Sequence, residues 1–314
     1  MADDLTILCG TATPALAGRI AARLGVPLGA TAVERFPDGE CSVRLLEPVR
    51  SKRVFLIQST SPPPDPHLVE LLWLADACRR AAAAHVTAIL PYFGYARSDK
   101  RHGRRDPIGA AVVAELLEAV GVEHVVTLDL HAEQIEGFFR IPVDALTAVP
   151  ALCHALRDGE QLPPDLVVVS PDAGRVKTAA EYARRLNAPV AVLHKRRLSG
   201  TTTEVTHVVG DVRGRTCVVI DDMISTGGTL ARAAEALVSA GARPHIVVAA
   251  THGPLIDSAR AKLEHPAIKR VLVTDTVGRP ELDWPGWRVV SVAGLLASAI
   301  GRMAEGKSLA DLYV

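Results

Sequence analysis

The stretch VVIDDMISTGGTL, residues 218–230, joins an apolar run to two adjacent carboxylates and then to a turn of small residues. The apolar residues at 218–220 are typical of the end of a strand, and an apolar pattern resumes at Leu230. A glycine-containing turn that opens a helix presents backbone N–H groups, which favour anions. The stretch therefore predicts a strand, an anion-binding turn and a helix in succession.

The side chains of this stretch predict a sugar phosphate as the ligand. Carboxylates repel phosphate, so Asp221 and Asp222 suit the hydroxyls of a sugar, which donate hydrogen bonds to them. Glycine lets the main chain approach a ligand closely, and hydroxyls can donate to phosphate oxygens. The turn offers both, at Ser225, Thr226, Gly227, Gly228 and Thr229. The alternative is a capped turn beside solvated acids.

Short apolar runs recur along the chain with helical patterns between them. They are TILCG, RVFLIQS, VTAILPYF and HVVTLDL in the first half, then DLVVVS, PVAVL, CVVID, IVVAATH and RVLVTDT. Unbroken apolar runs favour strands covered on both faces, as in parallel sheets. Helical stripes follow Leu68, Leu71, Leu72, Ala75 and Cys78, and also Val112, Val113, Leu116, Leu117 and Val120. The alternation predicts an α/β fold with doubly wound, mainly parallel sheets.

The series of strands runs twice, which predicts two tandem domains. At about 150 residues per domain, the 314 residues fit two cores. Pro142 and Pro150 bracket a stretch that lacks strand character, so we place the domains at 1–147 and 148–314, with the last helix packing back on the first domain. In open parallel sheets, ligands bind beyond the carboxyl ends of the strands.

Composition narrows the partners and the compartment. Basic and acidic residues balance at 35 each, so no net field attracts nucleic acid or an anionic membrane. No apolar run approaches the roughly 18 residues of a membrane span, and the start, MADDLTILCG, lacks the basic residues of a secretory signal. The five cysteines have no metal-binding spacing, which favours free thiols. We expect a cytoplasmic protein without nucleic-acid or membrane partners.

Two chemically active residues lie at the end of the run HVVTLDL, residues 124–130. Asp129 and His131 come at its end, and strand alternation would turn both to one side. Carboxylate and imidazole are plausible partners of Mg²⁺ and its waters. Because a lone histidine is usually structural, a structural role for His131 stays open.

Asp172 follows the run DLVVVS and precedes a helix, with Pro171 and Gly174 shaping the turn. A ligand at the end of this strand would meet its carboxylate. The alternative is an N-cap, for which aspartate is a favoured residue.

The run AVLHKRRLSG ends in three bases, Lys195, Arg196 and Arg197. Such side chains neutralise a transferring phosphoryl group, and alternation sends Lys195 and Arg197 to one side. The Gly, Ser and Thr residues at 199–203 would let the loop act as a lid. A solvated basic turn is the alternative.

The stretch PYFGYARSDKRHGRRDPI, residues 91–108, places Tyr92, Phe93 and Tyr95 before a run of bases. A nucleotide needs both a π surface and partners for its phosphates. The stretch therefore indicates a nucleotide-binding loop, although charge runs are more often solvated.

Taken in order, these motifs resemble the ribose-phosphate pyrophosphokinases, also called PRPP synthetases. The likeness runs from RFPDGECSVRL at 35–45, which is similar to an F-x-DGE signature, to the C-terminal LADLY. The stretch at 95–99 is similar to a YARQD loop, and the stretch at 218–230 resembles the PRPP loop shared with phosphoribosyltransferases. The resemblance implies two phosphoribosyltransferase-like domains.

The resemblance also implies roles for individual residues. Ribose 5-phosphate would bind Asp221, Asp222 and the turn 225–229. ATP would bind the loop residues Arg97, Ser98 and Asp99 and, from a neighbouring subunit, the F-x-DGE residues Phe36, Asp38, Gly39 and Glu40, with Phe36 stacked on adenine. Mg²⁺ would lie near Asp129, His131 and Asp172. Lys195 and Arg197 would be catalytic.

The implied activity transfers the β,γ-diphosphoryl group of ATP to the 1-hydroxyl of ribose 5-phosphate, giving PRPP and AMP in a homo-oligomer, a dimer or larger. A phosphoribosyltransferase that consumes PRPP and a non-catalytic regulatory relative are the alternatives. The first leaves the ATP-type loop and the Lys-x-Arg motif without roles, and the second fits poorly with a complete set of site residues.

The chain departs from the family pattern in several places. Ser98 replaces a common glutamine, Ser225 an aspartate, and Arg140 the aspartate of FFDIP, which alters the charge near the metal. Residues 256–258 replace a Ser-Gly-Pro-Ala turn that holds the inhibitor ADP. We therefore expect ADP inhibition at that site to be lost.

Overall fold

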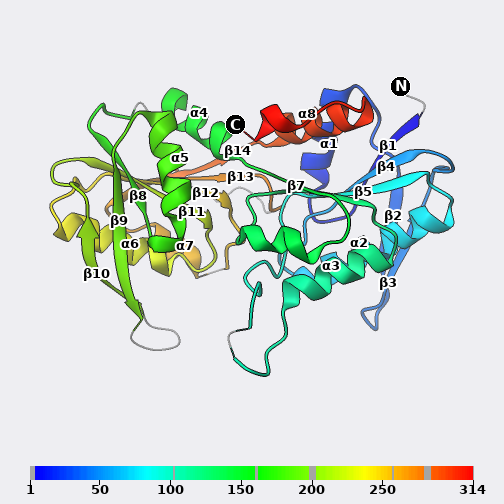
Figure 1. The fold of residues 1–314 in the computed structure, drawn as a ribbon, viewed down its shortest axis with the longest axis horizontal. Coiled ribbons are helices and arrows are strands. Elements are labelled where there is room, and N and C mark those ends of the chain that lie inside the picture. The colour runs from blue at the N-terminus through cyan, green and yellow to red at the C-terminus, as the bar shows by residue number, and fades with distance from the viewer. Residues whose placement is uncertain are drawn as a thin grey trace. The chain divides into compact units, whose positions relative to one another are not determined.

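The computed structural model describes residues 4–101, 103–159, 162–197, 203–256, 258–278 and 284–313, without the side chains of 195–197 and 203–206. Its contacts divide the chain into two compact units (Figure 1). Unit 1 comprises residues 1–147, 276–278 and 291–314, and unit 2 comprises residues 148–275 and 279–290.

Unit 1 is built on a five-stranded parallel sheet. Its order is β1 (Leu5–Cys9), β4 (Arg53–Ile57), β5 (His85–Leu90), β6 (His124–Leu128) and β7 (Val143–Leu146). Helices α1 (Pro14–Leu24) and α8 (Ala293–Ala304) lie side by side on one face, and α2 (Pro64–Arg80) and α3 (Gly109–Ala119) cover the other (Figure 1). A separate antiparallel hairpin consists of β2 (Thr31–Arg35) and β3 (Cys41–Leu45). Short 3₁₀ helices are η2 (Glu133–Phe138) and η4 (Ala310–Leu312).

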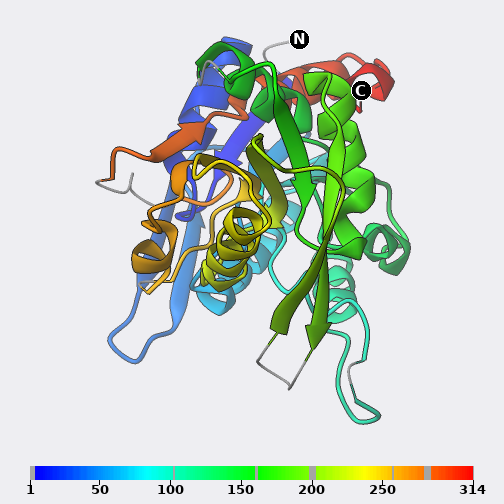
Figure 2. The same cartoon turned by 90° about the vertical axis from the view of Figure 1, so that its left-hand side faces the viewer.

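Unit 2 contains a seven-stranded sheet that is parallel except for β10. Its order is β10 (Thr203–Val209), β9 (Val190–Arg197), β8 (Leu166–Ser170), β11 (Thr216–Met223), β12 (Ile246–His252), β13 (Ile268–Thr274) and β14 (Trp287–Val290). Helices α4 (Val149–Gly159) and α5 (Val176–Leu186) pack on one face, and α6 (Gly228–Ser239) and α7 (Ala259–Leu263) on the other. Figure 2 shows β9 and β10 continuing together as a ribbon past the other strands of this sheet.

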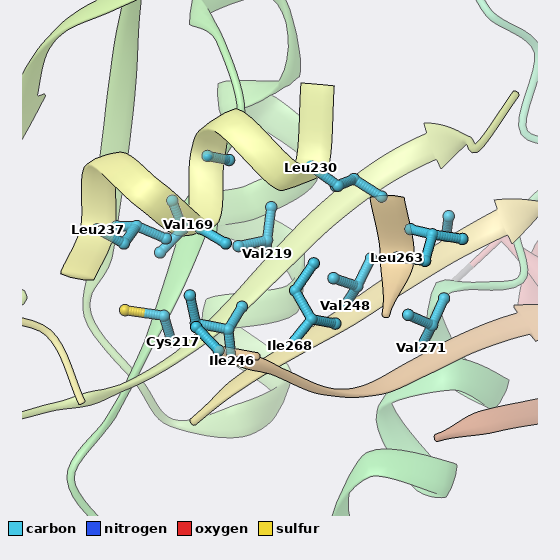
Figure 3. Close-up of a cluster of buried hydrophobic side chains, with 14 of the residues drawn as sticks. Val169, Cys217, Val219, Leu230, Leu237, Ile246, Val248, Leu263, Ile268 and Val271 are labelled. Carbon is cyan, nitrogen blue, oxygen red and sulfur yellow. The ribbon is translucent and has the colours of Figure 1, made fainter. Parts of the chain in front are cut away.

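The core of unit 2 explains why its strands are apolar without interruption. Leu230 and Leu237 of α6 and Leu263 of α7 lie over Val219, Val248 and other valines and isoleucines of the sheet (Figure 3). Residues of β11 from 216 to 220 are all buried, as expected for a strand covered on both faces. The predicted α/β fold with mainly parallel sheets is confirmed.

The structure also contains strands that the sequence patterns did not predict, namely β2, β3, β7, β10 and β14. The expectation that 142–150 lacks strand character was wrong, because β7 pairs in parallel with β6. Strand β7 lies at the edge of the sheet and carries Asp144, whose Oδ2 is 2.7 Å from His124 Nε2. A polar residue on an edge strand breaks the apolar run that marks a central strand.

The stripe predicted for α3 was partly wrong. Val112 and Leu116 are exposed by 49% and 39%. The buried face is instead Ala110, Val113, Ala114 and Leu117. The other predicted stripe, on α2, is fully buried.

Truncation of Leu237 tests the core of unit 2. This side chain is fully buried in α6, so Leu237→Ala leaves a cavity and is expected to lower the free energy of unfolding by about 2–5 kcal/mol. Its exposed neighbour supplies the control: Val238→Ala should change stability far less. Urea unfolding of both variants is the measurement, and equal losses would contradict the packing described here.

Candidate active site

The order of strands in unit 2 reverses between β8 and β11. Strand β8 is followed along the chain by β9 on one side, whereas β11 is followed by β12 on the other. Such a switch point opens a crevice beyond the carboxyl ends of the two strands. Asp172 follows β8, and Asp221 and Asp222 lie near the end of β11. The fold thus brings these predicted residues to the same edge of unit 2.

The two adjacent acids share one arginine. Arg175 Nη2 lies 2.6 Å from Asp222 Oδ2, and Arg175 Nε lies 3.9 Å from Asp221 Oδ1. The backbone N–H of Asp222 donates to Asp221 Oδ1 at 2.9 Å. The pKa of Asp221 is raised well above its usual range, because burial and the neighbouring Asp222 carboxylate raise it more than Arg175 lowers it.

The turn before α6 has the geometry expected of an anion site. Gly227 adopts φ 69°, in the left-handed region that favours glycine, and a Cβ there would lie 3.1 Å from the Ala259 carbonyl oxygen. The helix of 12 residues begins directly after it, at Gly228. The N-terminus of such a helix favours a phosphate electrostatically.

Asp172 caps the turn that follows β8. Its Oδ1 accepts a hydrogen bond from the Gly174 N–H at 3.0 Å, and its carbonyl oxygen accepts one from Ser170 Oγ at 2.7 Å. The capping role considered for this residue is therefore present in the structure, at the edge where a ligand is also expected.

Lys195 and Arg197 both belong to β9, where their backbones pair with Val205 and Thr203. Their side chains, like residues 199–202 of the predicted lid, lie outside the described part of the chain. Their catalytic roles therefore remain predictions.

In unit 1, the loop after β5 is held at two places by neighbouring segments. The Gly94 N–H donates to Thr60 Oγ1 at 2.5 Å, just beyond β4. Asp99 is buried, and its Oδ2 accepts from Gln134 Nε2 of η2 at 2.5 Å. Since η2 follows β6, these bonds fix the loop to both adjacent strand ends.

Two exposed residues of this loop, Tyr95 and Arg97, lie between its anchors. Arg97 is exposed, and Ser98 Oγ accepts from the Gly109 N–H at the start of α3, at 2.9 Å. The expectation of three aromatic side chains facing a nucleotide was wrong for Tyr92 and Phe93, which are 7% and 2% exposed. These rings fill the core, where Phe93 packs edge-on against Phe139 at 6.0 Å between centroids. Tyr95 is 38% exposed.

Asp129 and His131 follow β6, which ends at Leu128. Asp129 has φ 38°, and its Oδ1 accepts from Thr147 Oγ1 at 2.7 Å. Strand alternation therefore does not extend to these residues, so it cannot place them on one side as the sequence argument assumed. A non-glycine residue in this conformation is strained, and such strain concentrates at functional sites. Arg140 is exposed beyond η2, and its N–H donates to Glu118 Oε1 at 2.6 Å.

The F-x-DGE motif forms the tip of the β2–β3 hairpin. The Phe36 N–H donates to the Glu40 carbonyl at 2.9 Å, and the Glu40 N–H donates to Asp38 Oδ1 at 3.0 Å. Gly39 closes the turn with φ 94°. Phe36 is 50% exposed, so a large apolar ring stands in solvent at the tip.

Sequence reasoning missed residues that support the site. Arg175 directly follows Gly174 in the turn after DLVVVS but was not assigned a role, and Thr60 and Gln134 were not considered. The signal for Arg175 was a base at the start of a helix beside a predicted acidic pair. Thr60 and Gln134 have no such signal, because their partners are distant in sequence.

Comparison with known proteins agrees with this architecture over the whole length. Residues 5–121 match the family model of the N-terminal domain of ribose phosphate pyrophosphokinase, and residues 198–314 match the phosphoribosyl synthetase-associated domain. A ribose-phosphate pyrophosphokinase of Burkholderia pseudomallei is 45% identical over 99% of this chain and 98% of its own. One from Caldanaerobacter subterraneus subsp. tengcongensis is 47% identical with the same coverage.

A solved structure shows the same fold. The crystal structure of phosphoribosylpyrophosphate synthetase from Mycobacterium smegmatis has a TM-score of 0.89 and 41% identity, covering 96% of this chain and 99% of the other. The parallel sheets and the full-length likeness define an α/β transferase. The chain belongs to the ribose-phosphate pyrophosphokinase family.

Among the described residues, no helix is long and apolar enough to cross a membrane. The same residues contain no group of three or more His, Cys, Asp or Glu side chains that could hold a metal ion by themselves.

Proposed function

We propose that this protein transfers the β,γ-diphosphoryl group of ATP to the 1-hydroxyl of ribose 5-phosphate, giving PRPP and AMP. The observation that carries the proposal is the pair Asp221–Asp222 beside the helix-opening turn at 225–229. This arrangement offers carboxylates to the ribose hydroxyls and backbone N–H groups to the 5-phosphate. Its place at the switch point of unit 2 and the names of the full-length relatives both support it.

ATP is proposed to bind through unit 1. Arg97 would pair with phosphate oxygens, for which an arginine side chain is well suited, and Ser98 and Asp99 would shape the loop around it. Asp99 is held by Gln134, so its part is to fix the loop more than to meet the nucleotide.

The active form is proposed to be a homo-oligomer. Phe36 is exposed at a hairpin tip and would stack on the adenine of a neighbouring subunit, with Asp38 and Glu40 accepting hydrogen bonds from the amino group of the adenine.

Since the chain's five cysteines are all free, as is usual in reducing compartments, we propose that the enzyme acts in the cytoplasm.

Asp129 and His131 are proposed to bind Mg²⁺ together with ATP, and Asp172 is proposed to bind Mg²⁺ beside the ribose. Proteins typically bind this ion through one or two carboxylates and substrate phosphates rather than through a cage of their own, so these donors fit it without a larger acidic cluster. Bound Mg²⁺ would neutralise charge on the phosphate oxygens. Lys195 and Arg197 would stabilise the charge that develops on the transferring group.

Formation of AMP and PRPP from ATP, Mg²⁺ and ribose 5-phosphate tests the proposal directly. The protein should make both products and should do so without a free nucleobase. Consumption of PRPP with a base would instead identify a phosphoribosyltransferase, and no turnover of either kind would identify a non-catalytic relative.

A titration with ADP at saturating ribose 5-phosphate, with phosphate present, tests the expected loss of regulation. ADP should inhibit only by competing with ATP, because residues 256–258 have lost the family's regulatory turn. Asp257 of that turn lies outside the described residues.

Replacement of Asp172 by asparagine separates its cap from its proposed metal role. Asparagine caps a helix about as well as aspartate, so Asp172→Asn should keep the bond to the Gly174 N–H and leave the melting temperature nearly unchanged. It removes a charge, so the Mg²⁺ concentration for half-maximal rate should rise and turnover should fall. An unchanged Mg²⁺ dependence would leave Asp172 as a cap alone.

A further inference from the structure

A shielded arginine spans the two acids of the proposed ribose subsite. Arg175 ends the 3₁₀ turn η3 (Ala173–Arg175) after β8, whereas Asp221 and Asp222 belong to β11. The side chains of Arg175 and Asp221 are each 16% exposed, and that of Asp222 is 7% exposed. One guanidinium thus reaches both carboxylates where little water can screen them.

We propose that Arg175 is a positioning residue that orients Asp221 and Asp222 for the ribose hydroxyls of ribose 5-phosphate and offsets part of the repulsion between them. This inference rests on the proposed function, since it deepens the role of the same subsite.

The physical argument starts from the cost of adjacent charges. Two carboxylates that share a poorly solvated site favour protonation of one of them, and here the two acids are consecutive residues of β11. A protonated acid makes weaker hydrogen bonds with a hydroxyl donor, because the charge that strengthens them is gone. Arg175 counters this by placing a permanent positive charge against both acids.

Geometry adds a second reason for an arginine. Nη2 lies at hydrogen-bond distance from Asp222, so the planar guanidinium sets the direction of that carboxylate, while Nε faces Asp221 at 3.9 Å. Because Arg175 comes from the segment after β8, the ion pair also ties together the two strand ends that bound the switch point.

Two other arginine–acid pairs among the described residues of unit 2 lack these features. Arg185 pairs with Glu181 within α5, at 20% and 36% exposure, and Arg243 pairs with Asp165 at 49% and 39%. Neither pair lies at the carboxyl end of β11. The shielding of the Arg175–Asp222 ion pair and its place at the strand end therefore set it apart from surface ion pairs, which contribute little to stability.

The test compares Arg175→Gln and Arg175→Lys with the control Arg185→Gln, which breaks an ion pair of equal length on α5. Steady-state kinetics give kcat and the KM for each substrate, and the rise in Tm caused by ribose 5-phosphate alone reports its binding without catalysis. Arg175→Gln should raise the KM for ribose 5-phosphate by about tenfold or more, since charge-assisted hydrogen bonds are roughly twice as strong as neutral ones. The KM for ATP should stay unchanged.

Lysine keeps the charge but cannot span both acids, so Arg175→Lys should give a KM for ribose 5-phosphate between those of the wild type and Arg175→Gln. If Arg175→Gln does not fold, the lysine variant decides: a raised KM supports the proposal and a wild-type KM overturns it. A wild-type KM and Tm response in Arg175→Gln, or a loss confined to kcat or to ATP, also overturns it. Failure of the wild type itself to make PRPP or to respond to ribose 5-phosphate would instead reject the proposed function.

Discussion

Lys195→Ala is expected to lower kcat by a factor on the order of 100 or more, the cost of losing one strong preorganised donor to a transition state. In phosphoryl transfer, most of the rate comes from positioning and charge neutralisation, and Lys195 is the proposed cation for the transferring group. Because the interaction strengthens as charge develops, the KM values should change much less than kcat. The initial rate of AMP formation at saturating substrates is the measurement.

Lys269→Ala is the matched control, since it removes an exposed lysine of unit 2 whose Nζ donates only to the Pro266 carbonyl, at 2.7 Å, among the contacts described. It should turn over at the wild-type rate. Arg197→Ala tests the second member of the motif in the same assay. Normal turnover in Lys195→Ala would remove this residue from the mechanism and would favour the reading of 195–197 as a solvated basic turn.

Gly94→Ala is expected to disable the ATP loop while leaving the ribose subsite intact. A Cβ on Gly94 would lie 2.4 Å from the Thr60 carbonyl oxygen and 2.9 Å from Thr60 Oγ1. The first contact is with backbone, so the loop itself must move and carry Arg97 with it. A displacement of about 1 Å at a reacting centre can cost about 100-fold in rate, and we expect a loss of that order in kcat/KM for ATP.

Gly18→Ala provides the control within unit 1. This glycine lies in α1 with no atom within 4 Å of the added Cβ, and alanine in a helix is favoured over glycine by about 0.5–1 kcal/mol. Activity should be unchanged and stability equal or higher. In Gly94→Ala the rise in Tm with ribose 5-phosphate should persist, because the proposed subsite belongs to unit 2. A wild-type KM for ATP in Gly94→Ala would show that the loop position does not govern nucleotide binding.

The central parallel strands could be predicted from sequence because each is a short, unbroken apolar run. Burial on both faces allows few polar residues, as the fully buried β8 and β12 illustrate. Edge and hairpin strands lack this signal. Strands β2 and β3 are only partly buried, and β7 carries Asp144, so local patterns did not distinguish them from loops.

The chemistry of the site could also be predicted where the residues that carry it are contiguous in sequence. The acids at 221–222 and the glycine turn at 227–228 are contiguous, so their spacing alone predicted a sugar phosphate. The turn at the β2–β3 tip is local in the same sense, since Gly39 and Asp38 act on their immediate neighbours.

Only the tertiary structure decided which distant residues support that chemistry. Arg175 meets Asp222, Gln134 meets Asp99, and Thr60 meets Gly94 because parallel strands bring their carboxyl ends to one edge of each sheet. It also decided that Phe93 fills a core rather than facing a ligand, since an aromatic residue after a strand has the same local sequence in either case. Local periodicity fixes what each segment can form, whereas contacts between segments depend on strand order, which no single stretch of this sequence encodes.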